Sequence, residues 1–468
     1  MLKGYLMPHP PLIVPGIGSG DEIPATRQAC EQIAAELREL APQTVVIISP
    51  HSILYEDYFH IAPGLKAAGD FGNFRAGKIK FAVEYDSELA VLIGDLAQKE
   101  GIPAGSLGEK QRELDHGVLV PWHFIAEAYS KQIQDCEMLK STGLPRLVRI
   151  SLSGLPLLDH YRLGICISAA AHRLGRSIAV LASGDMSHRL KEDGPYGFNP
   201  AGPQHDELVC SCVRDANVER LLAISTSFCE QAGECGLRSL IMMLGSLDGW
   251  RIESRLLSYE GPFGVGYLTA AFSGVEEAPS LLPRLREAKD TQLAQIRQGE
   301  DAYTSLARLN AEHFVRTGQY IELPPDLPAE LLSQQAGVFV SIKKQGRLRG
   351  CIGTIAPTQK HIAAEILKNS VSAACHDPRF EPIQPDELAD LTYSVDVLAP
   401  AEPVSDPNDL DVLRYGVIVS SGYKRGLLLP NLEGVDTVEQ QIDIARQKAG
   451  ISQRENYKLE RFEVVRHT

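Results

Sequence analysis

The sequence predicts an α/β domain, with a mixed sheet covered by helices on both faces, followed by a smaller α+β domain. Short β-branched runs alternate with amphipathic segments in the first part of the chain, and a charged, proline-containing stretch interrupts this pattern. Beyond that stretch, strands and helices follow one another in a different order. A chain of 468 residues is long enough for two to four domains, each with its own core.

Strand-like and helical segments alternate in the first domain. The runs 4–7, 44–48 and 177–182 are apolar or β-branched, and each stops at a turn with proline or glycine. Segments 23–40 and 89–99 carry apolar residues at helical spacing. Strands that alternate with helices of this length predict a sheet with helices on both faces.

A change of composition marks the domain boundary. Pro279 and Pro283 precede a charged, weakly helical run, so we expect a first domain over 1–275, a linker over 276–299 and a second domain over 300–468. The expected strands of the second domain are 337–342, 392–398 and 417–420, and its expected helices are 302–317, 361–374 and 438–448.

Charge and cysteine usage restrict the class of protein. The 46 basic and 60 acidic side chains give a net charge of −14, which disfavours binding to nucleic acid or to anionic membranes. No apolar run reaches the roughly 18 to 20 residues needed to span a bilayer. The nine cysteines are scattered, odd in number and without a CxxC pair, which is typical of reduced thiols. We therefore expect a cytoplasmic protein.

Three histidines stand where predicted strands of the first domain end. His9 follows the first strand, His51 the second and His188 a later one. Ligand sites of open α/β sheets gather at the carboxyl ends of the strands. A single histidine beside a proline is more often a surface or core residue, but three in equivalent places indicate a shared site.

Glu234 is a further candidate ligand. It precedes the strongly apolar run 240–244, in what reads as the first turn of a buried helix. One interpretation is a helix N-terminal charge stabilised by the macrodipole. The other is a metal-binding carboxylate, because two histidines and one carboxylate form the Fe(II) site of non-haem oxygenases.

Four short motifs follow one another in the first domain, with Glu234 after them. The motifs are Met7-Pro8-His9-Pro10-Pro11, Ser49-Pro50-His51-Ser52, Asp115-His116-Gly117 with Pro121 after it, and Ser183-Gly184-Asp185-Met186-Ser187-His188. In this order they resemble the class III extradiol ring-cleaving dioxygenases, the LigB-type enzymes, over roughly residues 1 to 272.

This resemblance implies a reaction and a role for each residue. The activity would be Fe(II)-dependent ring opening of a catechol-like or aminophenol-like aromatic by O2. His9, His51 and Glu234 would hold the iron. His188 would be the acid/base that exchanges protons with the substrate hydroxyl, since imidazole titrates near neutral pH. His116 would contact the substrate or support the metal ligands.

The same segments also resemble the Memo family, which implies a different outcome. Residues 185–188 and Cys235-Gly236 are similar to Memo segments in which a cysteine stands near the place of the carboxylate. If Cys235 faces the site in place of Glu234, the metal preference shifts towards softer ions. The alternative function is then a metal-binding or scaffold protein without oxygenase activity. We favour Glu234 because iron and O2 chemistry calls for a hard ligand.

Cys351 is the candidate functional residue of the second domain. It lies between Gly350 and Gly353, and the structural interpretation is a small buried thiol at a tight strand turn. The functional interpretation is a reactive cysteine, because the neighbouring Arg349 would lower its pKa. His376 is then a potential base partner.

Three motifs mark the second domain: Leu348 to Ile355, Asp377-Pro378-Arg379-Phe380 and Gly426 to Pro430. They resemble the AMMECR domain, and the similarity covers about residues 300 to 468. A LigB/Memo-like domain joined to an AMMECR domain resembles a fused pair from the AmmeMemoRadiSam system. This implies a radical-SAM protein as a partner beside the small aromatic substrate and O2. The oligomeric state stays open, a homo-oligomer included.

Overall fold

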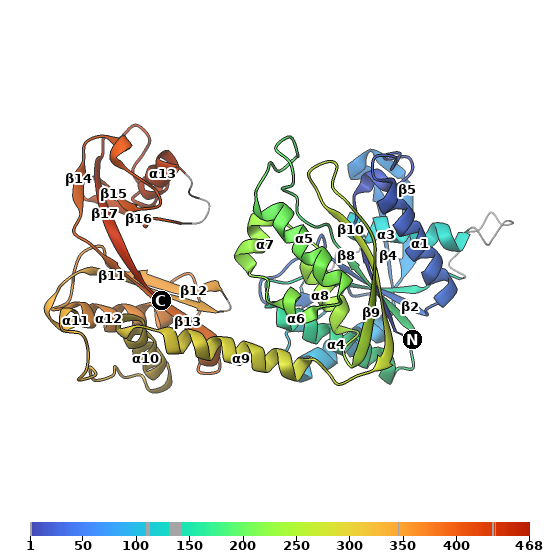
Figure 1. The fold of residues 1–468 in the computed structure, drawn as a ribbon, viewed down its shortest axis with the longest axis horizontal. Helices are drawn as coiled ribbons and strands as arrows, with labels where there is room; N and C mark the ends of the chain where they lie inside the picture. Colours follow the sequence, from blue (N-terminus) through green and yellow to red (C-terminus); the bar gives the residue numbers. More distant parts are fainter. Residues whose placement is uncertain (1, 109–112, 131–142, 345, 433–434, 436) are drawn as a thin grey trace. The chain divides into compact units, whose positions relative to one another are not determined.

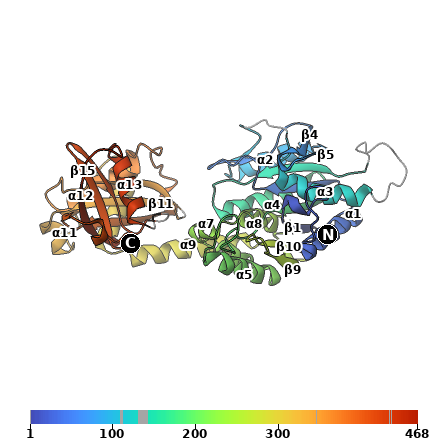
Figure 2. The same cartoon turned by 90° about the horizontal axis from the view of Figure 1, so that it is seen from above.

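The computed structural model describes residues 2–108, 113–130, 143–344, 346–432, 435 and 437–468 (Figure 1; Figure 2). The chain divides into two compact units, one up to residue 286 and one from 287 onwards. Within the described part of the chain, no helix is both long and apolar enough to cross a membrane. Cys136 lies outside the described residues, and the other eight cysteines are free thiols.

A six-stranded mixed sheet forms the centre of the first unit, as predicted. Its strand order is β7-β2-β8-β1-β10-β9. The first four strands are parallel, whereas β10 runs antiparallel to β1 and β9 antiparallel to β10. The strands are β1 (Lys3–Met7), β2 (Thr44–Ser49), β7 (Arg146–Ser151), β8 (Ile178–Ser183), β9 (Trp250–Glu260) and β10 (Tyr267–Glu277).

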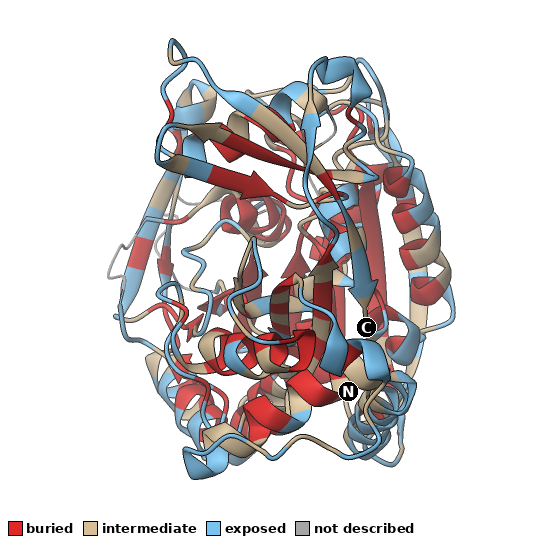
Figure 3. Ribbon diagram, turned by 90° about the vertical axis from the view of Figure 1, so that its left-hand side faces the viewer, coloured by how far each residue is buried: buried red, intermediate tan, exposed pale blue. Residues whose placement is uncertain are grey.

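Helices cover both faces of this sheet, which confirms the predicted fold class. All six residues of β2 are buried, and so are all six of β8. Figure 3 shows buried residues in red. Val46 and Ile48 pack on one face with residues of α2 (Ser87–Lys99), α4 (Leu157–Arg173) and α8 (Leu237–Gly245). The alternate residues Val45 and Ile47 pack on the other face with residues of α1 (Pro24–Leu40) and α3 (His116–Ser130). Burial on both faces explains the continuous apolar runs of these strands.

Shorter elements complete the first unit. They include two small two-stranded sheets, β3-β6 and β4-β5. The elements are η1 (Pro11–Ile13), β3 (Phe59–His60), β4 (Lys66–Phe71), η2 (Gly72–Phe74), β5 (Ala76–Glu84), β6 (Ala104–Gly105), α5 (Ala201–Arg214), α6 (Val218–Leu222) and α7 (Thr226–Ala232).

An antiparallel sheet forms the second unit, with the order β12-β11-β13-β17-β15-β16 and β14 paired to β17. Helices α10 and α12 pack on β11 and β13, and α13 packs on β15 and β16. The elements are α10 (Ala302–Thr317), α11 (Ala329–Ser333), β11 (Gly337–Lys344), β12 (Arg347–Gly353), α12 (Ile362–Cys375), η3 (Leu388–Asp390), β13 (Leu391–Leu398), β14 (Glu402–Val404), η4 (Pro407–Asp409), β15 (Tyr415–Ser421), β16 (Lys424–Leu428), α13 (Val438–Lys448) and β17 (Lys458–His467).

The predicted linker 276–299 contains the helix α9 (Leu282–Gly299). Its side chains are mostly exposed, and Leu285 is the one buried apolar residue of the helix. Because only one residue of this helix is buried, the apolar periodicity that marks a helix in sequence is weak here.

The turn after β8 and the loop before α8 approach each other at backbone distance. A Cβ atom at Gly184 would lie 2.2 Å from the Cα of Gly236, closer than any real side chain tolerates. Ser239 Oγ donates a hydrogen bond to the carbonyl oxygen of Ser183, 2.8 Å away, at the same place. Glycine at both positions is therefore required by packing.

We expect the substitution Gly184→Ala to lower the free energy of unfolding of the first unit by about 1–3 kcal/mol, because the new methyl group must displace backbone. Gly77→Ala is the matched control in the same unit, since the nearest atom to its Cβ would lie at an ordinary contact distance of 3.5 Å. Calorimetric unfolding of both variants measures the difference. Equal stability of the two would contradict the packing argument.

Candidate metal centre

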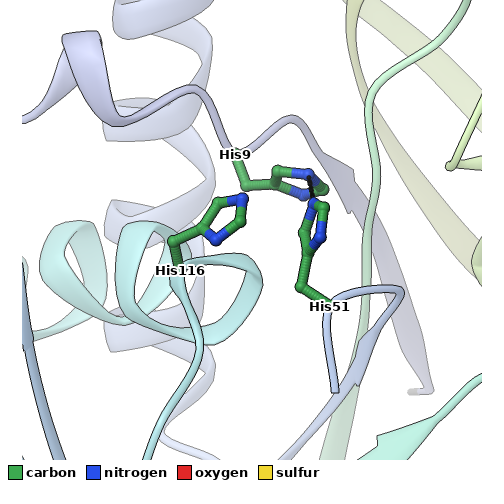
Figure 4. Close-up of side chains that lie close together, drawn as sticks. All are labelled: His9, His51 and His116. Atoms are coloured by element: carbon green, nitrogen blue, oxygen red, sulfur yellow. Dashed lines mark hydrogen bonds between the residues drawn. The ribbon is translucent and has the colours of Figure 1, made fainter. Parts of the chain in front are cut away.

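Three imidazoles converge at the carboxyl edge of the parallel strands of the first unit. His9 follows β1, His51 follows β2, and His116 is the first residue of α3, which packs against β2. One ring nitrogen of each lies within 4.8 Å of those of the others (Figure 4). The structure therefore brings together two histidines predicted as metal ligands and one predicted as a neighbour of the site.

Hydrogen bonds fix the tautomer of His9. Ser183 Oγ donates to the carbonyl oxygen of Gly117 at 2.6 Å, and His9 Nδ1 lies 2.9 Å from the same Oγ. Because a serine hydroxyl has a single proton, His9 Nδ1–H is the donor and Ser183 the acceptor. The lone pair of His9 therefore sits on Nε2, the nitrogen that faces the other histidines.

His51 completes the central pair. Its Nε2 lies 2.9 Å from Nε2 of His9, and its ring centroid lies 3.9 Å from that of His116. With His9 Nε2 unprotonated, His51 donates this hydrogen bond in the metal-free protein. A metal ion that displaces the shared proton would find two nitrogens already directed at one point.

Asp115 holds the loop that carries His51. Ser49 Oγ donates to its Oδ1 at 2.6 Å, and Ser52 Oγ donates to its Oδ2 at 2.7 Å. Arg149 Nη1 lies 3.7 Å from the same carboxylate. These contacts flank His51 on both sides, so the loop after β2 and the start of α3 are fixed relative to each other.

Burial keeps the three imidazoles neutral. It lowers the pKa of His9 well below its usual value, and the neighbouring His51 lowers it further. Burial, followed by His51 and His9, lowers the pKa of His116 to about 3. Burial also lowers the pKa of His51, although Asp115 opposes this. Neutral imidazoles retain the lone pairs that a metal needs.

Cys235 lies beside this group of histidines. Its Sγ is 3.8 Å from Nε2 of His9 and 3.8 Å from Nε2 of His188. The backbone N–H of Asp185 donates to the same sulfur at 3.2 Å. Burial, and then the charge of Asp185, raises the pKa of the thiol well above its usual value.

Asp185 and His188 complete the polar surroundings. Asp185 Oδ1 accepts from the backbone N–H of His9 at 2.9 Å, and burial raises the pKa of this carboxyl to about 6 despite that bond. Burial lowers the pKa of His188, with Asp185 opposing. The ring of His188 stacks on Tyr196, with centroids 5.1 Å apart.

The structure does not bring Glu234 to the three histidines. Its Oε2 instead accepts a hydrogen bond from the backbone N–H of Leu237 at 2.7 Å, and a carboxylate oxygen lies with His205 and Cys229. The physical reason is the backbone contact between Gly236 and Gly184. This contact places the side chain of Cys235, and not that of the preceding Glu234, beside the histidines. The alternative in which the cysteine faces the histidines agrees with this geometry.

Cys351 of the second unit lies in β12, among polar partners to which the sequence analysis gave no role beside it. Ser341 Oγ donates to its sulfur at 3.2 Å, and its backbone N–H donates to Asp377 Oδ2 at 2.8 Å. Arg379 binds the Asp377 carboxylate and also donates to the carbonyl oxygen of Cys351 at 2.9 Å. Hydrogen bonds from Arg379 lower the pKa of Asp377 to about 2.

Arg349 and His376 are not brought to Cys351. Arg349 is the extra residue of a β-bulge in β12, and its guanidinium binds Glu387 at 2.9 and 3.1 Å. His376 lies exposed at the C-terminal cap of α12, and the described residues show no hydrogen bond between it and Cys351. The bulge turns the arginine away from the cysteine two residues later.

Sequence reasoning assigned no role to Ser183, Asp185 and Asp115, which fix the histidines. Each lies in one of the four sequence motifs that contain a candidate histidine. Hydroxyl and carboxylate groups next to a candidate ligand are the usual orienting partners of metal-binding imidazoles, and this signal was available in the sequence.

The fold and site define a two-domain protein with a histidine-lined, metal-type centre in its α/β domain. The family model described as "Catalytic LigB subunit of aromatic ring-opening dioxygenase" matches residues 3–270, and the AMMECR1 model matches residues 304–467. The chain belongs to the LigB family and carries an AMMECR1 domain fused behind the LigB domain, as the sequence resemblance had indicated.

Individual relatives share one or both parts. Protein CA_C1420 of Clostridium acetobutylicum is 40% identical over 473 residues, which cover 99% of this chain and 98% of the relative. A Thermotoga maritima protein is 49% identical over 171 residues, which cover 36% of this chain and 98% of the relative. The crystal structure of the uncharacterized protein PH0010 from Pyrococcus horikoshii covers 36% of this chain and 91% of that chain at 32% identity, with a TM-score of 0.34.

Acid should destabilise the metal-free protein through His116. Its pKa is about 3 in the folded state and about 6.5 in an unfolded chain. Between these values only the unfolded state binds the proton, so stability contributed by this residue rises from pH 3 to pH 6.5. In His116→Asn the melting temperature should depend less steeply on pH over this range.

Thermal unfolding in the presence of a chelator measures this dependence. His172→Asn is the control, because His172 is exposed on α4 and lies outside the site. If the wild-type and His116→Asn slopes coincide, His116 is not held neutral by burial.

Proposed function

We propose that the LigB domain binds a metal ion through His9, His51 and His116, with Cys235 as an additional donor. With that metal the domain catalyses oxidation of a small catechol-like or aminophenol-like aromatic by O2. The observation that carries the proposal is the convergence of three neutral imidazole nitrogens within 4.8 Å of one another. Histidine-rich sets of this kind leave coordination positions free for substrate.

The three imidazoles are compatible with Fe(II), and the sulfur of Cys235 is the softer donor of the set. Imidazole suits iron, zinc and copper, and a thiolate adds one negative charge, as a carboxylate would. The charge balance expected for two histidines and Glu234 is therefore kept when Cys235 replaces the glutamate. The softer sulfur also widens the range of metals that the site accepts.

The residues around the metal position would bind and deprotonate the substrate. A bound Fe(II) supplies the means to hold an aromatic hydroxyl and O2 side by side. His188 is neutral at pH 7 because burial lowers its pKa, so it can accept the proton of a substrate hydroxyl and return it later. Stacking on Tyr196 fixes the plane of this ring.

A second candidate function is metal binding without oxygenase activity, in a module that acts with a radical-SAM partner. The position of Cys235 favours it, since a thiol stands where the oxygenase pattern has a carboxylate. The two candidates differ in O2 consumption, and both require a metal ion at this centre.

The deciding experiment measures metal content after purification without oxygen, followed by O2 uptake with catechol, protocatechuate and 2-aminophenol. Near-stoichiometric iron with uptake on any of these substrates supports the dioxygenase. Metal without uptake, even after addition of Fe(II), supports the second candidate. His9→Ala should lose this metal in either case, and full occupancy in that variant would contradict the proposed centre.

His188→Gln separates proton transfer from metal binding. We expect its turnover number to fall by about 100- to 10,000-fold, the usual contribution of a general acid/base, with the metal content unchanged. His172→Gln serves as the matched surface control. Unchanged turnover in His188→Gln would remove this histidine from the reaction.

A further inference from the structure

A second group of metal-type donors lies in the first unit, apart from the three histidines. His205 of α5, Cys229 of α7 and Glu234 of the loop between α7 and α8 place one ligand atom each within 4.8 Å of the others. His205 is fully buried, and Cys229 is 6% exposed. Two helices and the loop after the second one therefore meet at one place, where two of the three side chains are buried.

His205 has a buried ring nitrogen without a hydrogen-bond partner among the described residues. Its Nδ1 lies 3.0 Å from Asp206 Oδ1, and an ionised carboxylate only accepts hydrogen bonds, so Nδ1 carries the proton. The lone pair is then on Nε2, a buried atom with no hydrogen-bond partner among the described residues. A buried acceptor left unpaired is costly, and a bound ion is one of the few ways to satisfy it.

Asp206 is itself firmly held. Its Oδ1 accepts from the backbone N–H of Ser187 at 2.8 Å, and its Oδ2 accepts from the hydroxyl of Tyr259 at 2.7 Å. A carboxylate that binds one nitrogen of a histidine, and so directs the other outward, is the usual support of a metal-binding imidazole.

We propose that His205, Cys229 and Glu234 form a second metal site that takes a borderline divalent ion such as Zn(II). Zinc bonds of about 2.0–2.3 Å to nitrogen, sulfur and oxygen place ligand atoms about 3.3–3.8 Å apart, so the present separations need only a small contraction. A thiolate and a carboxylate neutralise the ion. The site does not depend on the proposed reaction at the first centre.

The position of this site indicates what it does. Glu234 immediately precedes Cys235, and Asp206 binds the backbone of Ser187, which immediately precedes His188. An ion at the second site therefore fixes the two segments that carry the thiol and the imidazole on the far side of the first centre. It acts as a positioning site for those groups.

The test uses Co(II) as a spectroscopic substitute for zinc in the full-length protein. In Cys235→Ser the thiol of the first centre is absent, so any thiolate-to-Co(II) charge-transfer band must come from another cysteine. We expect this band to persist in Cys235→Ser and to vanish in Cys235→Ser/Cys229→Ser. Cys235→Ser/Cys210→Ser is the matched control, since Cys210 of α5 is as buried as Cys229 of α7 but lies outside the cluster.

Titration with Zn(II) provides a second readout. Binding to the second site should weaken by about 10- to 100-fold in Asp206→Asn, which removes the support of His205. The isosteric Glu234→Gln should reduce Zn(II) stoichiometry by one equivalent and keeps the proposal testable if the cysteine variant does not fold. Absence of the band in Cys235→Ser, or its survival after loss of Cys229, overturns the proposal. O2 uptake is not used, so failure here is distinct from failure of the proposed reaction.

Discussion

The geometry of the first centre depends on the joint between the end of β8 and the start of α8. Gly184 and Gly236 touch through their backbones, and Cys235 N–H donates to the carbonyl oxygen of Asp185 at 3.2 Å while Asp185 N–H donates to the cysteine sulfur at 3.2 Å. Because this contact is between two backbones, no side chain can change rotamer to compensate for a displacement of either segment. The positions of the thiol and of the turn after β8 are therefore set together.

Burial is the largest cause of the pKa shifts at the centre. The histidines lie where solvation of a positive charge is poor, so they stay neutral, and the carboxyl of Asp185 has a raised pKa for the same reason. A metal ion would be held here by the lone pairs of neutral donors, whose directions are fixed by Ser183 and by the loop contacts of Asp115.

The sequence predicted much of the fold but less of the site. The runs at β1, β2 and β8 were recognised because strands buried on both faces are continuously apolar, and the same argument placed His9 and His51 at one edge. The inward residue at the loop before α8 was not predictable, because Glu234 and Cys235 are adjacent and a loop has no periodicity from which to read direction. The bulge at Arg349 is not predictable from the sequence for a related reason, because one inserted residue reverses the side of the sheet to which the following residues point.

The hydroxyl of Ser183 connects the start of α3 with the ring of His9. A chain of hydrogen bonds runs from the carbonyl oxygen of Gly117, in the first turn of α3, through this hydroxyl to the ring of His9. Each bond in such a chain polarises the next. The basicity of His9 Nε2 therefore depends on the position of the first turn of α3, the same turn that carries His116.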